Sequence, residues 1–183
     1  MATNNFNLKN LKKEKNKTLK KKIISLLNQK FLVKKYPLLL SLKKNYKYSY
    51  SFSKMKKLKK MKNFRIIGMG GSILGAQAIY SFLKYKIKKN FTFINNLNPK
   101  LNLDLKKKYV NIIISKSGNT LETISNTTLL IKNNTNLLIT EKNENYLSRL
   151  SQKIKCEIFE HKNFIGGRYS VLSEVGMLPA ELM

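Results

Sequence analysis

Short apolar runs alternate with helix-like stretches from Phe64 to the end of this 183-residue chain, and no other feature constrains the fold as strongly. Short runs rich in Ile, Leu and Phe indicate strands that are buried on both faces. Strands that alternate with helices indicate a parallel sheet with a layer of helices on each side. The sequence therefore predicts an α/β fold, a three-layer αβα sandwich with a parallel sheet of about five strands.

The individual elements can be placed from the same alternation. The expected strands are 64–69, 91–95, 109–115, 136–140 and 156–160. The expected helices are 72–86, 101–108, 119–133, 144–155 and 173–183. Because ligands of parallel sheets bind beyond the carboxyl ends of the strands, each loop that follows a strand is a candidate for the functional site.

The first 62 residues differ from the rest, because they carry 20 Lys against one acidic residue and contain no Gly. Within them, apolar residues recur at helical spacing, at Leu19, Ile23, Leu26, Leu27 and Phe31. This pattern predicts N-terminal amphipathic helices followed by a connector rich in Tyr, Ser and Lys. We favour a helical appendage, and the alternative is an arm that binds a membrane surface or RNA. The expected domains are a Lys-rich helical segment, 1–62, and an α/β domain, 63–183.

The formal charge of +28 raises the question of nucleic-acid binding, but its make-up argues against a specific site. Only three of the 37 basic residues are Arg, the residue that pairs best with guanine edges and phosphates. No run approaches the roughly 18 apolar residues of a membrane span. Cys156 is the single cysteine, so no internal disulfide forms and a cytoplasmic location is expected. We read Cys156 as a small buried side chain, and we expect neither a metal nor a cofactor.

The first expected strand ends in a glycine-dense loop, "GMGGSILG", from Gly68 to Gly75. A dinucleotide fingerprint would need a third Gly where Ile73 stands, and an acid at the end of the next strand, which ends in Asn. Gly70 and Gly71 allow the backbone to approach a ligand closely, and Ser72 could cap the helix and offer a hydroxyl. The loop therefore fits a small anion or a tight turn without a ligand.

The third expected strand ends in "SKSGNT", residues 115–120, where every residue except Gly118 offers a hydrogen-bonding side chain. Hydroxyls and amides at the start of a helix form a phosphate cradle with little fixed charge. The Walker pattern is absent. Asn119 and Glu122 have the spacing of a capping box, which accounts for these two residues but leaves the hydroxyls without a role.

These motifs resemble those of known proteins. Ser–x–Ser–Gly–x–Thr–x–Glu, from Ser115 to Glu122, resembles the signature of sugar isomerase domains, which have a flavodoxin-like fold and bind phosphosugars. "GGRYSVLS", from Gly166 to Ser173, resembles the signature of the phosphoglucose isomerase family, and "GMGGSILG" resembles that family's first glycine loop. The resemblance implies reversible isomerisation of glucose 6-phosphate to fructose 6-phosphate through a cis-enediolate, without a cofactor. It leaves mannose 6-phosphate open as a substrate.

The resemblance also implies roles for individual residues. Phosphate oxygens are expected at Ser115, Ser117 and Thr120, with Lys116 either neutralising them or pointing elsewhere; Gly71 and Ser72 match positions that contact the sugar or its phosphate. The family commonly has Phe–Thr where this chain has Gly118–Asn119.

Arg168 matches the family's catalytic arginine, whose guanidinium can stabilise the negative charge of an enediolate. Gly166 and Gly167 would let that loop approach the substrate. Glu122 is expected beside the ligand loop and not as the base, and His161 has no matching catalytic role.

The family's proton-abstracting Glu, ring-opening His and catalytic Lys lie beyond the Gly–Gly–Arg motif, so they are expected after Met183. The resemblance therefore implies an N-terminal part of the enzyme or a shortened gene product. The family enzyme is a homodimer with a shared site. The competing function is a non-catalytic phosphosugar-binding domain, which needs only the Ser/Thr loop.

Overall fold

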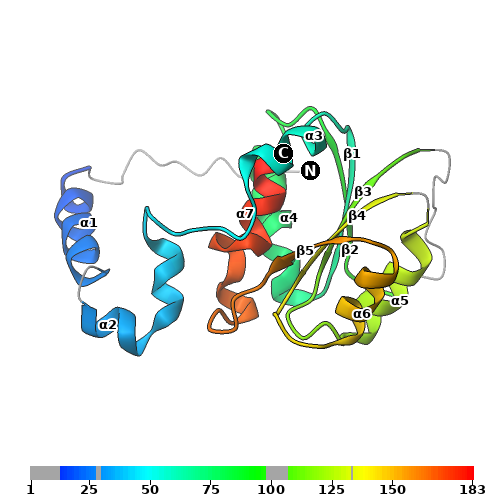
Figure 1. Ribbon diagram of the computed structural model, residues 1–183. Helices are drawn as coiled ribbons and strands as arrows, with labels where there is room; N and C mark the ends of the chain where they lie inside the picture. The colour runs from blue at the N-terminus through cyan, green and yellow to red at the C-terminus, as the bar shows by residue number, and fades with distance from the viewer. Residues whose placement is uncertain (1–12, 28–29, 98–106, 133) are drawn as a thin grey trace. The chain divides into compact units, whose positions relative to one another are not determined.

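The computed structural model describes residues 13–27, 30–97, 107–132 and 134–183, and the chain divides into two compact units (Figure 1). The first unit ends at Lys44 and contains α1 (Lys13–Leu27), α2 (Lys30–Lys35) and the 3-10 helix η2 (Pro37–Leu42). The expected N-terminal helices are therefore present. The second unit begins at Asn45 and includes the Tyr-rich residues 46–50.

The second unit is built on five parallel strands in the order β2-β1-β3-β4-β5. They are β1 (Asn63–Gly68), β2 (Asn90–Ile94), β3 (Val110–Ile114), β4 (Thr135–Thr140) and β5 (Glu157–Glu160). The helices are α3 (Phe52–Leu58), α4 (Leu74–Leu83), α5 (Leu121–Leu130), α6 (Tyr146–Lys153) and α7 (Glu174–Leu182), with 3-10 turns η3 (Gly70–Ser72) and η4 (Gly167–Leu172). The predicted fold class is confirmed. Most of the helix expected at 101–108 lies outside the described residues.

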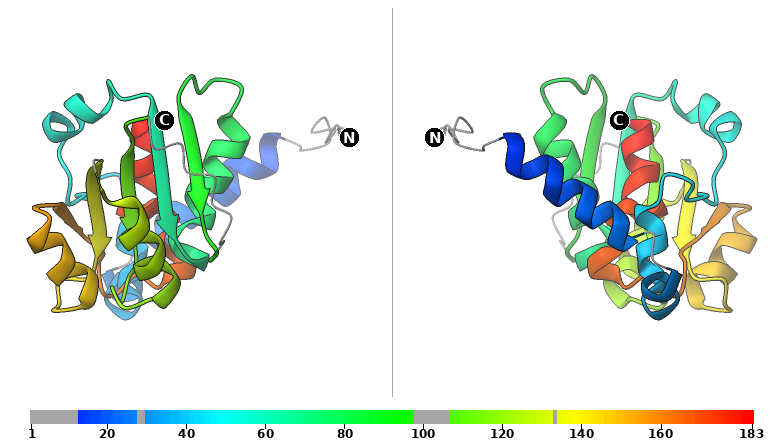
Figure 2. Two further views of the ribbon diagram at one scale, coloured as in Figure 1. Left: turned by 90° about the vertical axis from the view of Figure 1, so that its right-hand side faces the viewer. Right: turned by 90° about the vertical axis from the view of Figure 1, so that its left-hand side faces the viewer.

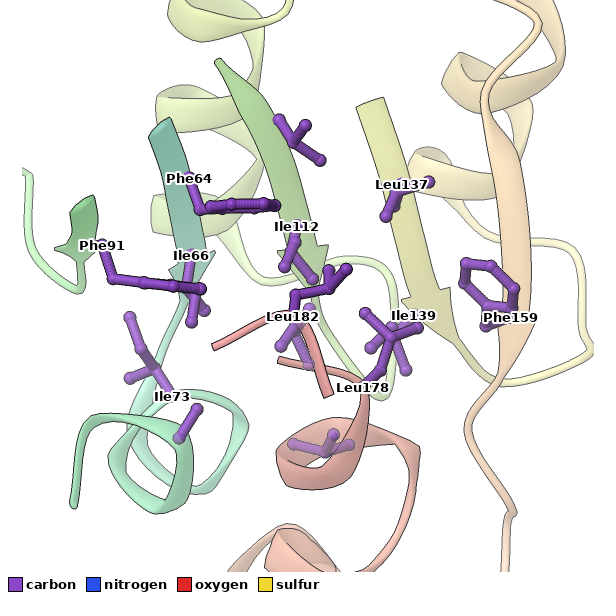
Figure 3. Close-up of a cluster of buried hydrophobic side chains, with 14 of the residues drawn as sticks. Phe64, Ile66, Ile73, Phe91, Ile112, Leu137, Ile139, Phe159, Leu178 and Leu182 are labelled. Carbon is purple, nitrogen blue, oxygen red and sulfur yellow. The ribbon is translucent and has the colours of Figure 1, made fainter. Parts of the chain in front are cut away.

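Helices cover both faces of the sheet (Figure 2), and a hydrophobic cluster on each face explains these three layers. Alternate residues of each strand point to opposite faces, so Ile66 and Ile112 face one side whereas Ile67 and Ile113 face the other. Leu178 and Leu182 of α7 complete the first cluster and point toward the strand side chains (Figure 3). Leu130 of α5 and Leu147 of α6 complete the second. Burial on both faces accounts for the continuous apolar runs.

A segment without helix or strand, residues 45–51, is bonded to the start of α7. The Tyr46 hydroxyl donates to Oε2 of Glu174 over 3.0 Å, and the Ser49 N–H donates to Oε1 over 2.8 Å. Glu174 is fully buried, so these bonds satisfy a carboxylate that has left water. The rings of Tyr46, Tyr48 and Tyr50 follow one another, with centroids 5.0 and 5.1 Å apart. We refer to residues 45–51 as the tyrosine strap.

From β1 the chain first adds β2 on one side, and it then crosses to add β3 on the other side of β1. The order of strands therefore reverses between the neighbours β1 and β3, where Gly68 pairs with Ile114. In parallel α/β sheets this reversal opens a crevice beyond the carboxyl ends of the two strands, where ligands bind. The two loops that the sequence marks, after β1 and after β3, therefore leave the sheet side by side. Of the helices that the structure describes, none combines the length and the apolar character needed to cross a membrane.

Candidate functional site

The glycine loop after β1 packs directly against the segment that carries Arg168. A Cβ atom added to Gly71 would lie 2.3 Å from the carbonyl oxygen of Gly167 and 2.9 Å from the nitrogen of Arg168. The Ser170 hydroxyl lies 3.2 Å from the carbonyl oxygen of Gly71 and 2.7 Å from that of Gly167, close enough to donate to both. The absence of a side chain at Gly71 therefore permits this contact, and the two predicted motifs form one surface.

The loop after β3 adjoins the same surface. A Cβ atom added to Gly68 would lie 2.8 Å from the carbonyl oxygen of Ile114, the residue before Ser115, and 3.2 Å from Cβ of Ser72. Arg168 itself is exposed. Backbone contacts thus join the first glycine loop to the arginine segment, and the strands from which the first glycine loop and the Ser/Thr loop leave adjoin at Gly68 and Ile114.

Two hydroxyl groups meet within the loop after β3, residues 115–120, which we refer to as the hydroxyl cradle. Oγ of Ser115 and Oγ1 of Thr120 lie 3.1 Å apart. The Gly118 N–H donates to Oγ of Ser115 over 3.1 Å, and the Asn119 N–H donates to Oγ of Ser117 over 3.3 Å. Thr120 is the N-cap of α5 and makes no side-chain capping bond, so its hydroxyl is not engaged with the helix. The cradle gathers neutral polar groups at the start of a helix, a place where an anion is favoured.

Gly118 adopts a φ of +66°, which a residue with a side chain rarely tolerates. A Cβ atom there would lie 1.9 Å from Oδ1 of Asn145, the N-cap of α6. Asn145 and Ser148 form a reciprocal capping box that the sequence analysis missed, although the spacing of the two polar residues is visible. With Asn145 in this position, a side chain at position 118 would clash.

Two local expectations are wrong. Asn119 and Glu122 form no capping box, because Oδ1 of Asn119 accepts from the Tyr146 N–H over 2.9 Å and so points toward α6. Ser72 does not cap α4, whose N-cap is Ile73. Residues 70–72 form a 3-10 turn that delays the start of α4 to Leu74, which leaves the Ser72 hydroxyl outside the helix terminus.

Lys116 and Glu122 have different surroundings. The Lys116 ammonium donates to the carbonyl of Asn163 over 2.9 Å and lies 3.4 Å from Oε1 of Glu141, so it points toward the loops after β4 and β5. Glu122 lies in the first turn of α5, half-buried, where a carboxylate is favoured by the helix dipole. The Lys116 ammonium thus pairs with groups of the loops after β4 and β5, and the Glu122 carboxylate stands at the start of α5.

The other titratable candidates are structural. Burial raises the pKa of the Cys156 thiol to about 12, and Sγ lies 3.0 Å from the carbonyl oxygen of Asn136. His161 is 1% exposed, and burial is the main cause that lowers its pKa. Its Nδ1 lies 3.1 Å from the carbonyl oxygen of Lys162, and its Nε2 has no hydrogen-bond partner in the described part of the chain. No group of three or more His, Cys, Asp or Glu within the described ranges could hold a metal ion.

Comparisons with known proteins agree with the motifs. Residues 49–183 match the family model described as phosphoglucose isomerase. The chain is 38% identical to the glucose-6-phosphate isomerase of Methanocaldococcus jannaschii, over 72% of this chain and 35% of that protein. It is 39% identical to the glucose-6-phosphate isomerase of Borreliella afzelii, over 66% of this chain and 26% of that protein. The chain thus spans well under half the length of these curated relatives.

Solved structures support the fold. A hypothetical protein of Thermus thermophilus superposes with a TM-score of 0.65 at 22% identity, over 79% of this chain and 38% of that chain. The tagatose-6-phosphate ketose/aldose isomerase of Escherichia coli superposes with a TM-score of 0.55 at 15% identity, over 84% of this chain and 43% of that chain. At these identities the likeness concerns the architecture of the sheet and its helices.

Proposed function

This chain belongs to the phosphoglucose isomerase family, and on that premise we propose that it carries the phosphosugar-binding part of a glucose-6-phosphate isomerase. The reaction is the reversible conversion of glucose 6-phosphate to fructose 6-phosphate. The observation that supports this most directly is the contact between Gly71 and the Gly167–Arg168 backbone. It brings together, at the reversal point of the sheet, motifs that are far apart in the sequence.

The hydroxyl cradle would hold the phosphate. Ser115, Ser117 and Thr120 offer neutral hydroxyls, and the amides at the start of α5 offer further donors with the positive end of a helix dipole. Gly71 and Ser72 line the adjoining loop and would contact the sugar. Neutral donors suit a substrate that must leave again after reaction, because they bind an anion without a full ion pair.

Arg168 would act on the reacting carbons. Interconversion of an aldose and a ketose removes a proton beside a carbonyl, and negative charge then builds on oxygen in the cis-enediolate. A guanidinium held in place stabilises that charge more in the transition state than in the ground state. Gly167, in contact with Gly71, would fix the backbone from which Arg168 reaches the substrate. The proton-abstracting base would come from the rest of the enzyme, which we propose to be a cytoplasmic homodimer.

Two substitutions test this function. Fructose 6-phosphate titrated into the full chain, followed by NMR, should shift the amides of residues 115–120, and Ser117→Ala should weaken the affinity about tenfold. For turnover, residues 49–183 replace the matching part of the Methanocaldococcus jannaschii enzyme. In that chimera, Arg168→Ala should lower kcat/KM by roughly 10²–10³-fold. Arg149→Ala, an arginine exposed on α6, is the matched control and should leave both measurements unchanged.

A second function, phosphosugar binding without catalysis, is supported by one observation: all the hydroxyls of the cradle come from six consecutive residues of this chain. Binding therefore needs no other part of an enzyme. If Ser117→Ala abolishes binding, Arg168→Ala leaves binding intact and the unmodified chimera shows no turnover, the binding module is correct and the isomerase is not.

A further inference from the structure

The Lys116 side chain leaves the hydroxyl cradle and ends between two other loops. Its Nζ donates to the carbonyl of Asn163 over 2.9 Å and lies 3.4 Å from Oε1 of Glu141. The side chains of Lys116 and Glu141 are 33% and 20% exposed, so the pair is partly removed from water. The ammonium charge is therefore compensated by a carboxylate and a carbonyl, and this explains how a lysine can sit in a phosphate-binding loop without facing the ligand.

Backbone bonds hold the same three loops in a row. The Glu141 N–H donates to the carbonyl of Lys116 over 3.2 Å, and the His161 N–H donates to the carbonyl of Thr140 over 2.7 Å. The loops after β3, β4 and β5 are thus linked in sheet order. The Lys116 side chain crosses from the first of these loops to the third, and so it joins the cradle directly to the segment after β5.

That segment leads to the arginine. Asn163 lies five residues before Arg168. Between them, Ile165 is fully buried and its N–H donates to the carbonyl of Lys162 over 3.1 Å. The Tyr169 N–H then donates to the carbonyl of Gly166 over 2.9 Å. Residues 162–169, which we refer to as the arginine loop, form two consecutive turns with the buried Ile165 between them. A bond to the carbonyl of Asn163 therefore restrains the turn that carries Arg168.

We propose that Lys116 is a positioning residue that couples the hydroxyl cradle to the arginine loop, and is not a phosphate ligand. The proposal rests on the function proposed above, because it assumes that an anion binds at the cradle. An anion that restrains residues 115–120 also restrains the arginine loop, because the Lys116–Asn163 bond links the two segments. Substrate phosphate, far from the reacting carbons, thereby helps to set the position of Arg168.

Amide hydrogen exchange of the full chain, read by NMR at Ile165 and Tyr169, tests this coupling. In Lys116→Met, exchange at both amides should become about tenfold faster, because a hydrogen bond from a charged group is lost. Lys142→Met removes the same charge from the neighbouring loop, at an exposed position, and should leave both rates unchanged. Lys116→Arg keeps a cation that can reach both partners and should restore the slow exchange.

Inorganic phosphate gives a readout that a merely structural lysine would not affect. Phosphate should slow exchange at Ile165 and Tyr169 in the unmodified chain, and Lys116→Met should abolish this slowing. The phosphate affinity of Lys116→Met should nevertheless stay within about threefold of the affinity of Lys142→Met. Unchanged exchange rates in Lys116→Met overturn the proposal, and a loss of affinity beside them identifies Lys116 as a ligand. If the unmodified chain binds neither phosphate nor fructose 6-phosphate, the proposed function fails, whereas the exchange rates of the free chain still decide whether Lys116 holds the arginine loop.

Discussion

Single residues decide how closely the loops of the site approach one another. A Cβ atom added to Gly71 would meet backbone atoms of Gly167 and Arg168. A Cβ atom added to Gly167, on the other side of the same contact, would meet nothing within 4 Å. We expect Gly71→Ala to lower the free energy of unfolding by about 1–3 kcal/mol, because backbone must move to admit the methyl group. Gly167→Ala should change it by less than about 0.5 kcal/mol. Urea denaturation followed by circular dichroism measures both, and equal effects would contradict the contact.

His161 should make the stability depend on pH. Its pKa is lowered, mainly by burial and further by Lys116, against opposing effects of the Lys162 carbonyl, Glu141 and Glu174. The folded state thus favours the neutral ring. Its contribution to stability is complete above the unfolded pKa of about 6.5 and is lost as the pH falls through the lower folded value.

Urea denaturation at a series of pH values between about 7 and 5 measures this loss. His161→Asn keeps a donor near the position of Nδ1 but does not titrate, so its stability should fall less steeply with acidification. A variant with the same pH dependence as the unmodified chain would show that other groups are responsible.

At the scale of elements, the tyrosine strap and α7 support the turn η4, which carries Arg168. Both strap bonds end on the Glu174 carboxylate, in the first turn of α7, and the preceding residue, Ser173, caps that helix. Glu174→Ala should lower the free energy of unfolding by about 3 kcal/mol, because the Tyr46 hydroxyl and the Ser49 N–H lose a charged acceptor. Glu174→Gln retains an acceptor and should cost about 1 kcal/mol. Thermal and urea denaturation distinguish the two, and an alanine variant as stable as the glutamine variant would contradict the role of the strap.

The strands could be predicted from the sequence, and most side-chain partners could not. The apolar runs of β1, β3 and β4 are continuous because both faces of these strands are buried. The position of each strand can therefore be predicted from the run of apolar residues itself. The loops after β1 and β3 were also identified, because their glycines and hydroxyls stand directly after strands. The bond between Tyr46 and Glu174 joins residues 128 positions apart, and that between Lys116 and Asn163 joins residues 47 apart. Such pairings depend on how the loops pack, which local periodicity does not encode.

At the scale of the whole molecule, the division at Lys44–Asn45 predicts how the chain responds when its N-terminal residues are deleted. Removal of residues 1–44 should leave the sheet and its helices folded, with the free energy of unfolding changed by less than about 1 kcal/mol, because the sheet cores draw on the second unit. Removal of residues 1–51 also deletes the partners of Glu174 and should cost about 3 kcal/mol or more. Circular dichroism and urea denaturation of both deletions provide the test, and equal stabilities would show that the strap is dispensable.

The contact between Gly71 and the arginine segment also bears on biosynthesis. The Ser170 hydroxyl reaches back 99 positions to the Gly71 carbonyl, whereas the whole cradle spans six neighbouring positions. A growing polypeptide emerges from the ribosome in order, and contacts between distant positions form after local ones. The loop of residues 115–120 is therefore translated before the segment that Gly71 contacts, and the two motifs meet only after Ser170 has been synthesised.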